Sequence, residues 1–178
     1  SEAITGDLDK ALDEGAKYTG QETIMVLEGR VQDIIGLETM ILGVISAETT
    51  LANDKRGVDL DKARETMREV VEAAEGRQVS YFGARHWTFA QDADIAKAAY
   101  EGGASSCSTD IGAEQFGQKG LGTIPHALEN IYAWKSGREN AVTESTKAFD
   151  RVIDPAVPRI ALIDYRNREL DDTVATEK

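Results

Sequence analysis

Cysteine, histidine and proline are scarce in this chain of 178 residues, which holds one cysteine, two histidines and three prolines. A lone cysteine cannot form an intrachain disulfide, so we expect a reducing compartment and a cytoplasmic protein. Basic residues are also few, with 20 lysines and arginines against 32 aspartates and glutamates. The formal net charge of -12 argues against nucleic acid or an anionic membrane as a partner. No secretory leader is recognisable, and the most apolar stretch, 34–47, falls short of the ~20 residues that span a bilayer.

The first part of the chain, residues 1–77, reads as an N-terminal α/β and helical lead-in. We expect a short amphipathic helix within 1–20, a strand at 23–29 and a helix at 59–75 that Asp59 caps and Gly76 ends. Apolar residues crowd so densely over 31–51 that this segment predicts a buried helix, with a break near Gly43. We also expect Glu38 or Glu48, both within this segment, to pair with a basic group.

The second part, residues 78–178, alternates strand and helix patterns. Strands are expected at 79–83, 104–109, 121–123 and 159–164, and helices at 92–100, 125–134 and 141–153. This alternation predicts βα units and a parallel sheet, either open or part of a barrel. No Gly-x-Gly-x-x-Gly follows a strand, which removes the main support for a dinucleotide fold. A complete barrel takes ~250 residues, so the four units that fit here correspond to the first half of one.

One of the two histidines, His126, stands at the expected start of a helix in Gly122-Thr123-Ile124-Pro125-His126. A helix-start signal explains Thr123 as a cap and Pro125 in the first turn, but it does not explain the histidine. The positive end of a helix disfavours imidazolium and keeps the ring neutral and nucleophilic. The same dipole stabilises a phosphate on or near that ring, so we predict that His126 is functional.

The other histidine follows the expected strand 79–83 as part of Arg85-His86. Side chains at the carboxyl ends of parallel strands face a common mouth where ligands bind. Arg85 offers a planar fork suited to phosphate, although a salt bridge to a nearby acid explains it equally well. His86 is equally compatible with a ligand contact or with a partly buried structural imidazole.

Hydroxyl and carboxyl groups follow two other expected strands. Ser105 and Ser106 either line a polar pocket or belong to a small-residue strand packed under helices. Asp164 ends the strand at 159–164, where a carboxylate can hold a sugar diol or Mg²⁺, or simply cap the next turn. Arg166 and Arg168 follow in a charged segment, where we expect them to be solvated.

These motifs together resemble the nicotinate phosphoribosyltransferases, type II phosphoribosyltransferases, and in particular their shorter archaeal-like branch. The likeness runs from about 21 to 164. It rests on Phe82-Gly83-Ala84-Arg85-His86, Ala98-Ala99-Tyr100-Glu101-Gly102-Gly103, the serine-rich strand and Gly122-Thr123-Ile124-Pro125-His126-Ala127-Leu128. The resemblance implies an N-terminal α/β portion packed on an incomplete, TIM-like α/β barrel, and a homodimer with a shared site.

The resemblance also implies a reaction. Nicotinate and phosphoribosyl pyrophosphate would give nicotinate mononucleotide and pyrophosphate in NAD biosynthesis or salvage, with Mg²⁺ as cofactor and ATP as a co-substrate coupled through His126. Carried over by position, Arg85 would hold phosphate, His126 would contact or accept a phosphoryl group, and Asp164 would face the ribose. The residues that would contact the substrates are Arg85, His86, Ser105, Ser106, Thr123 and His126.

The chain departs from the family at three points. His86 stands where many members have a second arginine, and Tyr165 follows Asp164 where a threonine is expected. The later barrel strands and their glycine-rich phosphate loops are missing from this sequence, so we expect the 178 residues alone to be inactive. A quinolinate or nicotinamide phosphoribosyltransferase, or a non-catalytic fragment of this fold, are the alternatives.

Overall fold

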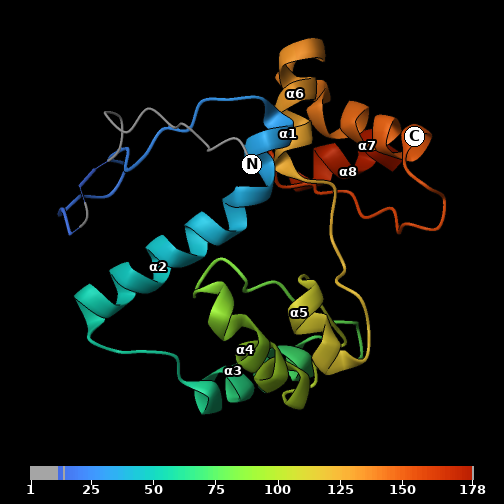
Figure 1. The fold of residues 1–178 in the computed structure, drawn as a ribbon. Helices are drawn as coiled ribbons and strands as arrows, with labels where there is room; N and C mark the ends of the chain where they lie inside the picture. Colours follow the sequence, from blue (N-terminus) through green and yellow to red (C-terminus); the bar gives the residue numbers. More distant parts are fainter. Residues whose placement is uncertain (1–11, 14, 178) are drawn as a thin grey trace.

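Two groups of helices make up most of the fold, and a long helix runs between them (Figure 1). The computed structural model describes residues 12–13 and 15–177. The first group consists of α3, α4 and α5, which pack in that order, and the second consists of α6, α7 and α8. The helices are α1 (Val31–Ile34), α2 (Glu38–Asp54), α3 (Leu60–Ala73), α4 (Phe89–Glu101), α5 (Asp110–Ala113), α6 (His126–Ser136), α7 (Ala141–Val152) and α8 (Glu169–Glu177), with single 3₁₀ turns at η2 (Ile35–Leu37), η3 (Glu114–Phe116) and η4 (Arg138–Asn140).

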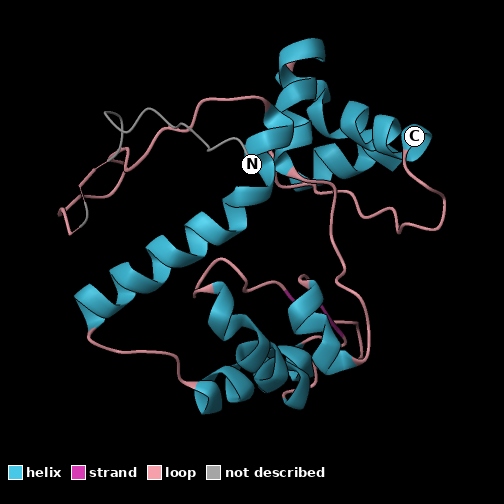
Figure 2. Cartoon of the chain, viewed as in Figure 1, coloured by secondary structure: helices cyan, strands magenta, loops and turns pink. Residues whose placement is uncertain are grey.

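The sheet has two short parallel strands, β1 (Ser80–Tyr81) and β2 (Ser106–Cys107), drawn in magenta in Figure 2. Ser80 lies opposite Ser106 and Tyr81 opposite Cys107, with α4 in the crossover between the strands. Both strands fall within the expected segments 79–83 and 104–109. The prediction of a parallel βαβ unit is therefore confirmed, although each strand is shorter than expected.

The other expected strands do not form in the described residues, which corrects the sequence-based prediction. The segments 23–29, 121–123 and 159–164 are irregular, and they make isolated backbone hydrogen bonds such as Ile124 N–H to the Ile160 carbonyl at 2.9 Å. A strand needs a partner along its length, and one bond does not supply a ladder. The fold is mostly helical α/β with a small parallel sheet, and the half barrel of four units is not confirmed.

The predicted helix boundaries agree with the structure where local capping signals decide them. Asp59 caps α3, and its side chain accepts a hydrogen bond from the Lys62 N–H at 2.9 Å. The helix expected at 92–100 begins earlier, because Thr88 and Gln91 form a reciprocal capping box. The helix expected within 1–20 lies largely outside the described residues, and the described part of that segment is not helical.

The apolar segment 31–51 is helical as expected, but it is not buried, which is a second correction. Across α1, η2 and α2 only Gly43 and Ala47 are buried. The helix does not break at Gly43. A Cβ added there would lie 2.4 Å from the Trp87 carbonyl oxygen, so glycine is required for close approach to the 84–87 loop.

The same segment has the length and composition of a membrane span. Among the helices that the structure describes, Val31–Asp54, with 24 residues, is the single one that meets this criterion, and 11% of its most apolar window is buried. One such helix is weak evidence for a membrane span, because core helices of soluble proteins have the same composition.

Candidate active site around His126

The candidate site begins at the first residue of α6, His126. Pro125 is the N-cap residue, with extended backbone angles, and no side chain caps the helix. Thr123 was expected to be the cap, but it lies two residues before the N-cap position, from which a hydroxyl does not serve the first turn. The first N–H groups of α6 are therefore left uncapped by side chains at an exposed helix end, the arrangement that favours an anion.

A carboxylate from a distant part of the chain reaches His126. The imidazole Nε2 lies 3.0 Å from Asp164 Oδ1, and both side chains are about half exposed, 46% and 53%. The hydrogen bond between Ile124 and Ile160 draws the segment that ends at Asp164 alongside the start of α6. A carboxylate on one ring nitrogen fixes the tautomer, so Nε2 carries the hydrogen and Nδ1 carries the lone pair.

A second carboxylate, Glu129, lies one helical turn further along α6. Its Oε2 is 3.9 Å from the same His126 Nε2, and its side chain is completely buried. Burial raises the pKa of Glu129 to about 7; the charge of His126 opposes this rise, and those of Asp164 and Asp172 add to it. Sequence reasoning missed this residue, although a carboxylate three positions after a histidine lies on the same helix face.

Of the residues after Asp164, Tyr165 and Arg166 are held in place, whereas Arg168 is solvated as expected, with 64% of its side chain exposed. The Tyr165 hydroxyl donates to Asn130 Oδ1 at 2.8 Å, and the Arg138 guanidinium lies 5.9 Å from the Tyr165 ring. Arg166 forms an ion pair with Asp172, a residue of α8 that is 1% exposed. The expectation that Arg166 is solvated is therefore wrong. This ion pair joins the segment before α8 to that helix.

Arg85 and His86 lie in the loop between β1 and α4 and make other contacts. Arg85 donates to Glu38 Oε1 at 3.1 Å and to Thr39 Oγ1 at 3.3 Å, so it joins this loop to α2. This confirms that one glutamate of the apolar helix pairs with a basic group. His86 is exposed and, with Trp87, lines a cavity of about 1050 Å³ between α3 and α4.

Ser105 and Ser106 serve the sheet. The Ser105 hydroxyl donates to the Val79 carbonyl at 3.0 Å, and the Ser106 hydroxyl lies 2.7 Å from that of Ser80 across the strand pair. These contacts are those expected of a small-residue strand. Of the residues singled out from the sequence, the structure thus joins His126 to Asp164. It gives Arg85 and the two serines other partners, and it places His86 on the wall of a cavity.

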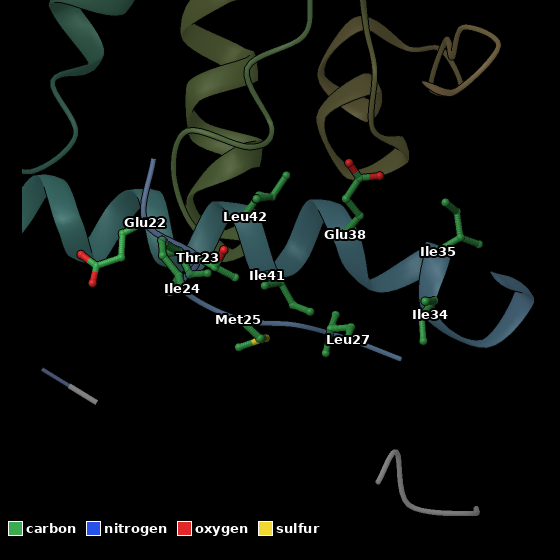
Figure 3. Close-up of a pocket in the computed structure, with 11 residues that line it drawn as sticks. Glu22, Thr23, Ile24, Met25, Leu27, Ile34, Ile35, Glu38, Ile41 and Leu42 are labelled. Atoms are coloured by element: carbon green, nitrogen blue, oxygen red, sulfur yellow. The ribbon is translucent and has the colours of Figure 1, made fainter. Parts of the chain in front are cut away.

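A second hollow, a groove of about 510 Å³, lies between the segment 22–27 and the helix that follows it (Figure 3). Its lining is apolar apart from Thr23 and the carboxylates of Glu22 and Glu38. Neither this groove nor the larger cavity is lined by His126 or Asp164. We place the chemistry at His126 rather than in either hollow, because an imidazole at a helix N-terminus there contacts an exposed carboxylate at 3.0 Å. Among the described residues no group of three or more His, Cys, Asp or Glu side chains is arranged to hold a metal ion.

Comparison with known proteins gives a single line of support. No family model matches the chain, and no curated protein matches it. The chain is similar to the crystal structure of a nicotinate-nucleotide pyrophosphorylase from Pyrococcus furiosus, with a TM-score of 0.51 and 36% sequence identity. The likeness is to a phosphoribosyltransferase-type enzyme. It covers 66% of this chain and 28% of that one, so the chain spans under a third of its relative's length.

This likeness supports a phosphoribosyltransferase relationship at a coarse level. It does not separate nicotinate from quinolinate as the substrate. The resemblance seen in the motifs and the similarity of the structure indicate the same class of enzyme.

Proposed function

We propose that this chain contributes one side of the active site of a pyridine phosphoribosyltransferase in NAD biosynthesis or salvage. In the forward reaction the ring nitrogen of nicotinate attacks C1 of phosphoribosyl pyrophosphate. The new bond joins nitrogen to C1, the bond from C1 to the pyrophosphate oxygen breaks, and pyrophosphate leaves with that electron pair. The observation that carries the proposal is the pairing of His126 with Asp164 at the N-terminus of α6, in a chain of which 66% matches a nicotinate-nucleotide pyrophosphorylase at 36% identity.

The N-terminus of α6 supplies binding energy for phosphate. Its free N–H groups and its dipole favour negative charge, and the His126 ring stands beside them. Orientation and charge placement dominate a reaction whose transition state resembles an oxocarbenium ion, because no covalent bond between the sugar and the protein is required. Asp164, the exposed carboxylate of the site, would face the ribose hydroxyls and could share Mg²⁺ bound to pyrophosphate, since Mg²⁺ takes one or two carboxylates beside phosphate oxygens.

Coupling to ATP would use the free nitrogen of His126. Because Nε2 donates to Asp164, the lone pair lies on Nδ1, and this atom would attack the terminal phosphorus of ATP. A bond from nitrogen to phosphorus would form, the bond from phosphorus to the bridging oxygen would break, and ADP would leave. Hydrolysis of the phosphohistidine would then return His126 and release phosphate.

Arg85 would bind phosphate in competition with Glu38. The guanidinium is about half exposed, so a phosphate can approach it from solvent while the ion pair with Glu38 is open. An exposed ion pair of this kind contributes ~1 kcal/mol or less, which a dianionic phosphate can outweigh. The other proposed substrate contacts are His86, Thr123, Ser105 and Ser106. We also propose a cytoplasmic location and a homodimer with a shared site.

Quinolinate is the second candidate substrate. The name of the relative refers to nicotinate nucleotide, and enzymes that decarboxylate quinolinate release the same product. A dicarboxylate calls for more positive charge around the pyridine than nicotinate does. The sequence beside Arg85 supplies only His86, which favours the monocarboxylate.

The test is product formation by the full-length gene product, with nicotinate, quinolinate and nicotinamide as separate substrates alongside phosphoribosyl pyrophosphate. We expect nicotinate mononucleotide from nicotinate, and a loss of at least ~100-fold in kcat/KM for His126→Ala. Trp134→Ala is the matched control, because Trp134 lies on the same helix and is 90% exposed. Equal losses in the two variants, or no product from any of the three pyridines, would overturn the proposal.

A further inference from the structure

Glu129 occupies a position that the proposed reaction does not explain. The side chain is completely buried, and within the described part of the chain neither of its carboxylate oxygens has a hydrogen-bond partner. Buried carboxylates in proteins are nearly always paired or hydrogen-bonded, because an unpaired one loses its hydration without compensation. A group left in this state needs a reason, and the nearest basic group, His126, supplies one.

Two carboxylates compete for one hydrogen atom at His126. Asp164 Oδ1 lies 3.0 Å from Nε2 and accepts its hydrogen, whereas Glu129 Oε2 lies 3.9 Å from the same nitrogen, too far for a hydrogen bond. Both carboxylates thus lie near the same nitrogen, Nε2, and the bond would pass from one to the other by a movement of the imidazole. Nδ1 stays uncommitted in either position.

The two acceptors differ in what can reach them. Asp164 is 53% exposed, so a ribose hydroxyl or a hydrated cation can bind it from solvent. Glu129 is inaccessible, so no ligand can occupy it. When a ligand engages Asp164, His126 loses its acceptor, and Glu129 is the remaining carboxylate within reach of Nε2.

We propose that Glu129 is a positioning residue, a reserve acceptor that takes the Nε2 hydrogen of His126 when a ligand binds Asp164. The exchange keeps the ring in one tautomer, and Nδ1 therefore keeps its lone pair while substrate binds. The idea rests on the proposed function only in assuming that Asp164 meets the ligand. The hydrogen-bond exchange itself needs no substrate and no turnover.

The charges around Glu129 agree with this role. Asp172, on α8, is neutralised by Arg166, and Asp164 and His126 stand at the open side. Burial raises the pKa of Glu129 to about 7, with His126 opposing the rise. The imidazole is thus the group that favours the carboxylate form, and movement toward Glu129 strengthens that effect.

The test removes the Asp164 carboxylate by mutation, which deprives His126 of its acceptor as a bound ligand would. In crystals of Asp164→Ala of the full-length gene product, we expect the distance from His126 Nε2 to Glu129 Oε2 to contract from 3.9 Å to hydrogen-bond range, about 3 Å. In solution, the Nε2 proton of ¹⁵N-histidine-labelled protein should remain visible in Asp164→Ala, because a buried acceptor slows its exchange with water. His126→Gln identifies the resonance. A ring that stays in place or turns to solvent would overturn the proposal.

Double variants separate the reserve acceptor from a structural effect. Asp164→Ala combined with Glu129→Gln keeps an acceptor oxygen and should retain part of the proton signal, whereas the combination with Glu129→Leu should lose it. Asp92→Asn is the matched control, since Asp92 is also buried with one unpartnered oxygen but lies on α4, in the other group of helices. Retention of the signal with leucine at 129, or its loss in Asp92→Asn, would contradict the assignment. These outcomes are independent of whether the protein makes nicotinate mononucleotide.

Discussion

Replacing Glu129 by glutamine removes a buried acid and should change the pH dependence of folding. Burial raises the pKa of this carboxyl from 4.5 to about 7; His126 opposes the rise, and Asp164 and Asp172 add to it. The folded state therefore binds the proton more tightly than the unfolded chain does. The stability that this proton contributes is complete below pH 4.5 and is lost as the pH rises through about 7.

The magnitude follows from the two pKa values. At ~1.4 kcal/mol per pH unit, a rise from 4.5 to about 7 amounts to about 3 kcal/mol of unfolding free energy. Typical domains unfold with ~5–15 kcal/mol in total, so the loss is a substantial fraction of stability. Glutamine has nearly the same shape and no charge to bury, so Glu129→Gln should escape this loss.

Urea unfolding of the wild type and Glu129→Gln between about pH 4 and about pH 8 checks the reasoning. The free-energy difference, variant minus wild type, should rise by about 3 kcal/mol across this range. Contributions from titrating groups that do not interact with Glu129 cancel in that difference. Glu65→Gln, at an exposed glutamate of α3, provides the matched control. A difference that stays constant, or that falls as the pH rises, would refute the assignment of Glu129 as a buried acid with a raised pKa.

Two further predictions concern the scaffold. Gly43→Ala should destabilise the fold by about 2 kcal/mol or more, because its Cβ would lie 2.4 Å from the Trp87 carbonyl oxygen. In Gly36→Ala the added Cβ meets nothing within 4 Å, so this variant should be neutral or slightly stabilising. Thermal unfolding distinguishes the two variants. Asp172→Asn should destabilise the fold in urea unfolding, because it leaves the Arg166 guanidinium without its counter-ion. Asp171→Asn, at a half-exposed position, should cost less, under ~1 kcal/mol. Similar losses within either pair would contradict the packing described here.

Local signals account for the parts of the fold that the sequence predicted well. Asp59 before an amphipathic stretch predicted the start of α3, and the alternation around residues 79–109 predicted the βαβ unit. Both depend on contacts within a few residues or within one compact unit. The segments 121–123 and 159–164 have strand-like composition too, but a strand requires a partner from elsewhere in the chain.

The predicted burial of the segment 31–51 was also wrong. The density of apolar residues over 31–51 correctly predicted a helix, but composition does not say which surface covers it, and the described residues cover little of it. The groove of Figure 3 lies on this helix and is part of the same uncovered apolar surface.

The candidate site was predicted residue by residue but not as an arrangement. His126 at the start of a helix and Asp164 were both singled out, and their hydrogen bond depends on a long-range approach that no local pattern encodes. Arg85 was given two explanations, and its contact with Glu38 corresponds to the ion pair. Glu129 was missed because a glutamate within a helix ordinarily faces water, and only the packing of α6 shows it to be buried.

One backbone hydrogen bond, from the Ile124 N–H to the Ile160 carbonyl, joins the chain before α6 to the chain that carries Asp164. The other bonds between these two parts of the chain are made by side chains, from His126 to Asp164 and from Tyr165 to Asn130, so the described residues form no backbone ladder there. Closing the two segments around a sugar phosphate would disrupt no regular element. The free-energy cost would be the conformational entropy lost by residues 161–164. The tightness of binding at this end of α6 will therefore follow the stiffness of that short stretch.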